Sequence, residues 1–181
     1  IEVAVCSTGL IGDRLPMDKV LAGVTAIVHE MAGGLTGGEE AARAIMTTDT
    51  VPKQAALHHD DNWTVGGMAK GAGMLAPSLA TMLCVITTDA VAGPEALDAA
   101  LRHAASRTFD RLDVDGSCST NDTVLLLASG ASGQTPSQDD LDAAVQMAAD
   151  ARLDPRTDLE RCVTTIVTAF RRSGDGARMA R

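Results

Sequence analysis

A threonine at the lip of a buried strand is the residue of this chain best placed to act as a nucleophile. Thr81 stands directly before the apolar, β-branched run 82–87, which is short, lacks polar alternation and lies between Pro77 and Asp89. A glycine-rich segment that begins at Lys70 precedes it. Because the strand holds the threonine from one side while the flexible segment leaves the other side reachable, we expect its hydroxyl to be positioned for attack on a carbonyl.

The segment that contains Thr81 resembles the self-cleavage and nucleophile site of the ornithine acetyltransferase (glutamate N-acetyltransferase) family of arginine biosynthesis. In that family the precursor is cut between Ala and Thr within K-G-x-G-M-x-x-P-x-x-A-T-M-L, and residues 70–83 read KGAGMLAPSLATML, with every fixed position matched. The resemblance implies cleavage between Ala80 and Thr81. Residues 1–150 would then be the core of the acetyltransferase domain, with 1–80 ending the α chain and 81–150 starting the β chain.

The chemistry of such a cleavage follows from the threonine itself. If the fold strains the bond before Thr81 and polarises the Ala80 carbonyl, the hydroxyl attacks it, and an N→O acyl shift gives an ester that water hydrolyses. The new chain begins with Thr81, whose α-amine has a pKa of about 7.7–8.0 and can act as its general base. No histidine is required, and the four histidines of this chain form no obvious triad.

The predicted strand 2–6 ends in Ser7-Thr8-Gly9, where a hydroxyl and consecutive backbone N–H groups surround a glycine. Such groups form either an ordinary turn or an anion-binding nest of the oxyanion-hole type. The resembled family has the element C-S-T-G-x-I-G here and builds its oxyanion hole from the Thr and the Gly. The resemblance therefore assigns that role to Thr8 and Gly9.

Three further residues are expected to bind substrate. Thr47 opens a Thr-Thr-Asp sequence that alone suggests a helix cap, whereas in the family the first threonine of M-T-T-D contacts substrate. Lys70 precedes the nucleophile by eleven residues, as in the family; its charge suits an amino-acid carboxylate, and the alternative is a solvated surface lysine. Glu160, ahead of Val163-Thr164, is the candidate for a family glutamate, although E-G in the family is E-R here.

The resemblance implies acetyl transfer from N2-acetylornithine to glutamate, in ping-pong fashion through acetyl-Thr81 and without a cofactor; whether acetyl-CoA also serves as donor is left open. It also implies that the two cleavage products stay associated, as two α and two β chains in the full-length family. Relative to the family, we expect this chain to lack N-terminal and C-terminal portions, including the D-P-N-W-G segment. The alternatives are an inactive fragment and a related self-cleaving aminopeptidase, in which the nucleophile is usually serine.

Other candidate sites are weaker. A metal site at 58–61 would need neighbouring strand residues to converge although they point to opposite faces, so a solvated turn is expected there. The acidic stretch 110–122 has neither the glycine nor the glutamate spacing of a calcium loop. Residues 71–76 fit G-x-G-x-x-A, but the following proline and strand leave no room for the helix that a dinucleotide site requires.

Composition and charge restrict the classes of partner that we expect for this chain. The net charge is −9 and the pI about 4.7, which argues against a nucleic-acid or polyanionic membrane partner. No apolar run approaches the ~18 residues of a membrane span. The four cysteines are isolated, so we expect reduced thiols in the cytoplasm. Residues 151–181 carry seven arginines against four acids and are expected to form an atypical basic tail, either aberrant or disordered.

Hydrophobic periodicity places the site within alternating strands and helices. The expected strands are 2–6, 51–58, 62–68, 82–87, 124–128 and 163–167, and the expected helices are 16–31, 38–46, 94–109 and 138–149. The adjacent strands 51–58 and 62–68 argue against a purely parallel sheet. We therefore predict an α/β protein with mixed sheets. The α-β-β-α sandwich of the self-cleaving acetyltransferase and aminopeptidase families is consistent with this order.

Overall fold

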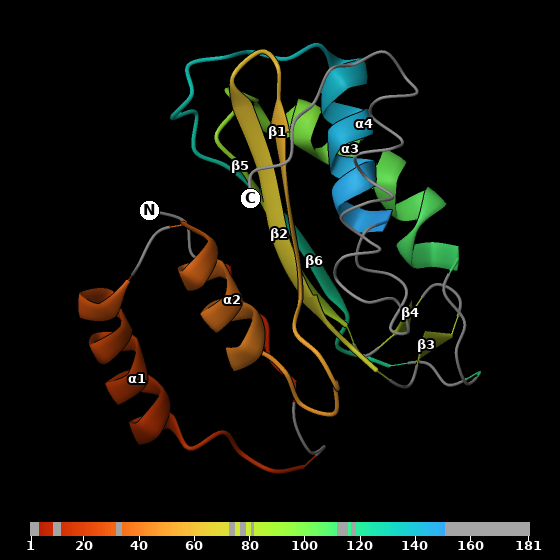
Figure 1. Ribbon diagram of the computed structural model, residues 1–181. Coiled ribbons are helices and arrows are strands. Elements are labelled where there is room, and N and C mark those ends of the chain that lie inside the picture. The colour runs from red at the N-terminus through yellow and green to blue at the C-terminus, as the bar shows by residue number, and fades with distance from the viewer. Residues whose placement is uncertain are drawn as a thin grey trace.

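The computed structural model describes residues 4–8, 12–31, 34–72, 75–76, 79–80, 82–111, 116 and 119–150 (Figure 1). Gly9, Thr81 and Glu160 of the predicted site lie outside these residues, as do the predicted strand 163–167 and the whole of the predicted tail 151–181.

A mixed sheet of four strands forms the centre of the molecule. The strands are β1 (Lys53–His59), β2 (Trp63–Lys70), β5 (Leu83–Thr88) and β6 (Thr123–Ala128), in the order β1-β2-β5-β6. The pairs β1–β2 and β2–β5 are antiparallel, whereas β5–β6 is parallel. Two short strands, β3 (Leu75–Ala76) and β4 (Leu79–Ala80), form a separate antiparallel pair. The predictions of an α/β class and of a sheet that is not purely parallel are thus confirmed.

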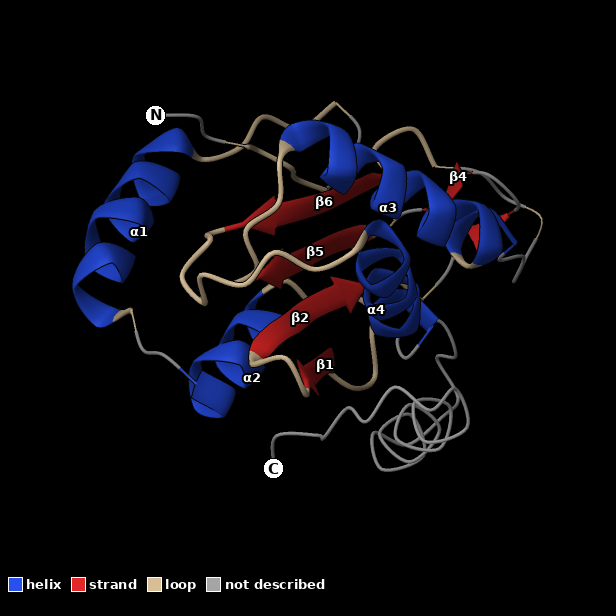
Figure 2. Ribbon diagram, turned by 90° about the horizontal axis from the view of Figure 1, so that it is seen from above, coloured by secondary structure: helices blue, strands red, loops and turns tan. Residues whose placement is uncertain are grey.

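Helices lie on both sides of this sheet (Figure 1). α3 (Pro94–Arg107) and α4 (Gln138–Asp150) pack together against one face, and a short 3₁₀ turn at Phe109–Arg111 follows α3. α2 (Gly34–Ala44) contacts β1 and β2 from the other side, while α1 (Met17–Glu30) stands apart from the sheet (Figure 2). An α-β-β-α sandwich contains two large sheets, whereas the described residues form one sheet of four strands and one pair of short strands. The sandwich therefore stays a prediction.

Small side chains build the interface between the helix pair and the sheet. Every second residue of the strands faces α3 and α4, among them Leu57, Val65, Cys84 and Ile86, all buried. The helices contribute alanines that are fully or almost fully buried: Ala100, Ala104, Ala144, Ala148 and Ala149. Because alanine projects so little, the backbones of α3 and α4 approach closely, and the chain fills this core with few aromatic residues.

We predict that Ala100→Leu destabilises the protein by about 1–3 kcal/mol, because three added carbon atoms have no space in this close-packed interface. Ala99, the preceding residue on the same helix, is exposed. Ala99→Leu is therefore the matched control and should change stability by less than about 0.5 kcal/mol. Urea unfolding of both variants measures the difference, and equal midpoints would contradict the packing described here.

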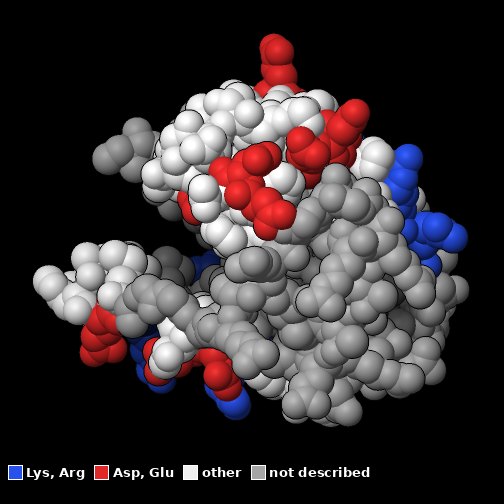
Figure 3. Space-filling model, turned by 45° about the horizontal axis from the view of Figure 1, so that its top comes forward, with Lys and Arg blue, Asp and Glu red and all other residues white. Residues whose placement is uncertain are grey.

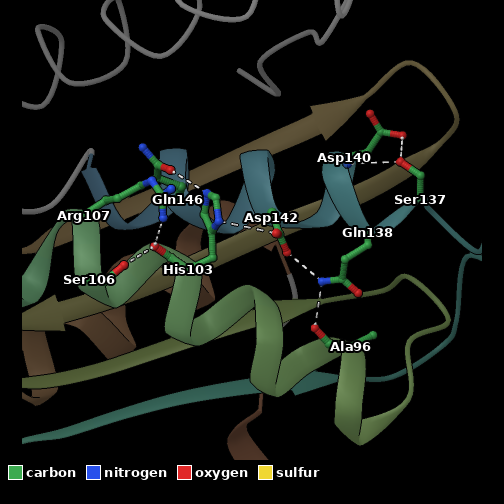
Figure 4. A network of polar contacts seen from close by, with 9 residues as sticks. All are labelled: Ala96, His103, Ser106, Arg107, Ser137, Gln138, Asp140, Asp142 and Gln146. Atoms are coloured by element: carbon green, nitrogen blue, oxygen red, sulfur yellow. Dashed lines mark hydrogen bonds and ion pairs between the residues drawn. The ribbon is translucent and has the colours of Figure 1, made fainter.

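Polar side chains join α3 to α4 beside this interface (Figure 4). His103 of α3 lies 3.1 Å from Gln146 (Nε2 to Oε1) and 3.5 Å from Asp142 (Nδ1 to Oδ2) of α4. Gln138 donates to Asp142 Oδ1 at 2.6 Å and reaches back to the carbonyl of Ala96 at 3.1 Å. These contacts set the register of one helix on the other.

Two boundaries differ from the sequence-based expectation. Ala4–Cys6 form no strand, and Val5 is 85% exposed; apolar alternation yields a strand only where a neighbouring strand supplies hydrogen bonds. The predicted helix 38–46 instead spans Gly34–Ala44. Its glycines disfavour helix intrinsically, and contacts of α2 with β1 and β2 compensate for that cost.

Figure 3 shows a group of Asp and Glu side chains on the upper part of the drawn face. At the lower left, acidic and basic side chains lie side by side. The upper acidic group would repel a polyanion. Within the described ranges, no helix combines the length and the apolar character needed to cross a bilayer.

Candidate functional site

Four strand termini meet at one end of the central sheet. Since β1 and β2 are antiparallel, β1 begins beside the end of β2. The register Lys70↔Leu83 places the start of β5 there, and the parallel pair Leu83↔Thr123 adds the start of β6. Residues that come directly before or after these termini are therefore brought together from distant parts of the chain.

Lys70 is the last residue of β2 and is 2% exposed. Side chains alternate along a strand, so Lys70 leaves the sheet on the face opposite to the buried Ala69. Its Nζ donates hydrogen bonds to Thr8 Oγ1 at 2.7 Å and to Thr47 Oγ1 at 3.2 Å. Thr8 is half-buried and Thr47 is exposed, so the two hydroxyls connect a buried cation to the surface. The interpretation of Lys70 as a solvated surface lysine is wrong.

Burial lowers the pKa of Lys70 below its usual value of 10.5. The carboxylates of Asp49 and Asp122 oppose this shift, and the positive charge of Lys53 adds to it. A negatively charged ligand at Lys70 would act in the same direction as the two carboxylates and favour the ammonium form.

Asp49 connects three segments of the site. Its side chain is inaccessible to solvent, and its Oδ1 accepts the backbone N–H of Gly71 at 2.7 Å and a short contact from Lys53 Nζ. Oδ2 accepts a weaker bond from the N–H of Thr47 at 3.4 Å. Burial alone would raise the pKa of Asp49, but the hydrogen bonds from Gly71 and Lys53 outweigh it and hold the pKa below its usual value.

The backbone of Gly71 is held at both its N–H and its carbonyl. While Asp49 accepts its N–H, its carbonyl accepts a hydrogen bond from Lys53 Nζ at 3.0 Å. Gly71 has φ 150°, a backbone conformation that residues with a side chain rarely adopt. The turn directly after Lys70 therefore depends on a glycine and on one buried ion pair.

The peptide of Met82 is held in a similar way. Its N–H donates to Asp122 Oδ1 at 2.8 Å, and its carbonyl accepts the N–H of Thr123 at 3.0 Å. Met82 follows the predicted nucleophile Thr81 directly. On the other side of Thr81, the backbone of Ala80 ends β4. Asp122 thus fixes the backbone next to the predicted cleavage bond.

The structure brings together Lys70, Thr8 and Thr47, three residues that the sequence resemblance assigned to one site. Sequence reasoning missed Asp49, which it treated as part of a helix cap. It also missed Lys53 and Asp122. The usable signal was their position, since Lys53 begins β1, Asp122 directly precedes β6 and Asp49 lies four residues before β1.

Residues weighed for other chemistry have structural roles. His58 contacts Thr64 Oγ1 at 3.1 Å, and His59 stacks on Trp63 with ring centroids 4.9 Å apart. Within the described ranges, no group of three or more His, Cys, Asp or Glu could hold a metal ion. The dinucleotide interpretation of 71–76 also lacks its helix, because the described residues that follow form the strands β3, β4 and β5.

Comparison with known proteins confirms the family resemblance. A sequence model of the ArgJ family matches residues 1–178. The chain is 81% identical over 150 residues to the arginine biosynthesis bifunctional protein ArgJ of Mycobacterium leprae, with 83% of this chain and 37% of that protein covered. It is 63% identical over 149 residues to the same-named protein of Streptomyces coelicolor, and 56% identical over 147 residues to that of Bifidobacterium longum.

These two alignments cover 82% and 81% of this chain and 38% of each relative. The chain thus spans less than two fifths of the length of the curated relatives that it matches. Since the family match extends over nearly all of the 181 residues, this chain belongs to the ArgJ family.

Proposed function

We propose that this chain carries a large part of the site that transfers an acetyl group from N2-acetylornithine to glutamate, through acetyl-Thr81, after self-cleavage between Ala80 and Thr81. The observation that supports it best is the buried ammonium of Lys70, which binds the hydroxyls of Thr8 and Thr47. These are residues that the family resemblance assigns to one site, and they lie 62 and 23 positions from Lys70 in the sequence.

Lys70 suits a substrate carboxylate. An ammonium group has three N–H donors, and among the described residues two of them serve Thr8 and Thr47. The third is available to the carboxylate of an N-acetylated or free amino acid. A charge-assisted hydrogen bond of this kind contributes about 1.5–3 kcal/mol to binding. Thr47, which is exposed, would contact the same substrate from the surface side.

The hydroxyl of Thr8 is suited to donate a hydrogen bond to an oxyanion. Its oxygen already accepts a hydrogen bond from Lys70, so its own O–H proton points elsewhere and can be donated. In the proposed reaction it is donated to the oxyanion that forms when the acetyl carbonyl is attacked, together with the N–H of Gly9. The cation behind Thr8 strengthens this donor, because Lys70 withdraws electron density from the hydroxyl oxygen.

Thr81 carries the acetyl group between two half-reactions. In the first, its hydroxyl oxygen bonds to the acetyl carbon, the C–N bond of N2-acetylornithine breaks, and ornithine leaves with the proton that the α-amine of Thr81 relays. In the second, the amine of glutamate attacks the ester, which restores the Thr81 hydroxyl and releases N-acetylglutamate. No cofactor takes part. The two cleavage products act as one unit, and in a full-length protein of the family they would assemble as two α and two β chains. Glu160 is the proposed additional substrate contact from the second product.

Acetyl transfer by the purified chain tests this proposal. N2-acetylornithine and isotopically labelled glutamate should give labelled N-acetylglutamate, and labelled ornithine should exchange into N2-acetylornithine without glutamate, as a ping-pong mechanism requires. Parallel reactions with acetyl-CoA decide whether it is a second donor. Release of free amino acids from peptides without acetyl transfer would favour an aminopeptidase, and absence of both reactions would contradict activity in this chain.

A further inference from the structure

We infer that Asp49 and Lys53 are positioning residues that hold the backbone N–H and carbonyl of Gly71 and thereby fix Lys70 and Thr47 for substrate binding. The role in substrate binding rests on the proposed function, whereas the geometry of the pair stands on the structure alone.

The polar atoms of both residues are engaged by the main chain and by each other. The Asp49 side chain is inaccessible to solvent and that of Lys53 is 11% exposed. Their polar atoms are instead directed at the backbone, to the N–H of Thr47 and to both polar groups of the Gly71 peptide. The effect of the pair must therefore pass through the position of the main chain.

That main chain determines where the Lys70 ammonium lies. Lys70 ends β2, so beyond it no ladder of the central sheet restrains the backbone. The next peptide is restrained by Asp49 and Lys53 across 22 and 18 residues of sequence. Since Thr47 is bound to the same carboxylate, one ion pair places both the cation and Thr47, which is one of its hydroxyl partners.

A purely structural ion pair is the competing explanation. Replacing a buried pair by apolar groups is often neutral for stability, so stability alone cannot separate the two roles. Substrate affinity can, and the electrostatic environment of Lys70 shows whether the pair lies close to its ammonium. The groups that face it are Thr8, Thr47, Asp49, Lys53 and Asp122, and among the charged ones the two members of the pair act on its pKa in opposite directions.

The test is a side-chain ¹⁵Nζ NMR titration of lysine-labelled protein. The chain has three lysines, Lys19, Lys53 and Lys70, and the exposed Lys19 is an internal reference. Asp49→Asn should lower the pKa of Lys70, because it removes a favourable negative charge, and Lys53→Met should raise it. Asp98→Asn breaks an exposed ion pair of the same i,i+4 spacing on α3 and should leave the titration unchanged.

Kinetics supply the second readout. If acetyl transfer is active, Asp49→Asn and Lys53→Met should each raise KM for N2-acetylornithine about tenfold while kcat changes less, as expected for misplaced binding groups. Lys53→Arg keeps the charge and should recover most of the loss. If the chain transfers no acetyl group, the NMR titration still tests the positioning role, so the two proposals fail separately.

An unchanged Lys70 titration in folded Asp49→Asn and Lys53→Met would overturn the inference, as would unchanged KM values in both. Circular dichroism establishes folding. Should both variants unfold, Asp49→Glu decides, because it retains the charge while displacing the carboxylate from the N–H groups of Gly71 and Thr47. A shifted Lys70 resonance or a raised KM in that variant would support positioning. Wild-type values of both the resonance and KM would overturn the inference.

Discussion

Replacement of Thr81 by alanine is expected to leave a single uncut chain of 181 residues and to lower acetyl transfer at least about a thousandfold. Alanine has no hydroxyl, so neither the N→O acyl shift nor the acetyl ester can form. The unaltered chain should instead yield pieces of 80 and 101 residues (1–80 and 81–181), the second beginning with Thr81. Intact mass and N-terminal sequencing measure both outcomes.

Thr81→Ser is the matched control because it keeps a hydroxyl at the same carbon and should retain cleavage at the same bond. The backbone at Met82 is held by Asp122 and Thr123 without the threonine side chain, so we expect the alanine variant to keep its fold. Cleavage at the same bond in Thr81→Ala would rule out this threonine as the nucleophile. An uncut unaltered chain would contradict self-cleavage.

Lys70→Met is the second large effect that we predict. It removes a charge-assisted contact to the substrate carboxylate, which corresponds to a rise in KM of about 10- to 100-fold. Methionine has a similar unbranched stem and no charge to bury, so the fold should persist. Steady-state kinetics of acetyl transfer measure the change. Lys19→Met, at an exposed lysine on α1, should leave KM unchanged.

The same lysine predicts a pH dependence. Burial lowers the pKa of Lys70, so affinity for the substrate should fall with rising pH before 10.5 is reached. For stability, the unfolded chain holds this proton up to about 10.5 while the folded chain releases it earlier. The unfolded state then binds more protons in that window, so this residue makes stability rise with pH there. Lys70→Met should flatten that slope in urea unfolding, and an equal slope in both proteins would contradict it.

Local sequence signals predicted much of the fold. Pro94 and Glu95 at the start of α3 suit the first turn of a helix, and the apolar stretch before Thr88 has the length of a buried strand. The predicted strand pair at 51–68 became the β1–β2 hairpin. Each of these elements is determined by residues close together in sequence.

The site was predictable only where a recognised sequence pattern marked it. Lys70, Thr8 and Thr47 were found through resemblance, whereas Asp49 and Asp122 were not. Their hydrogen bonds to Gly71 and Met82 span 22 and 40 residues, so they exist only once the strand order β1-β2-β5-β6 is set. The apolar alternation at residues 4–6 led to a wrong strand prediction for the same reason, because a strand depends on a neighbouring strand that local sequence does not reveal.

The isolation of α1 has a consequence for how the molecule moves. None of its fourteen residues is buried. Helices of about 12–15 residues are marginal in water without tertiary contacts. The amide protons of α1 should therefore exchange with deuterium far sooner than those of β2 and β5, through openings that leave the sheet intact. Among the described elements, α1 is the one that heat or denaturant would unwind first.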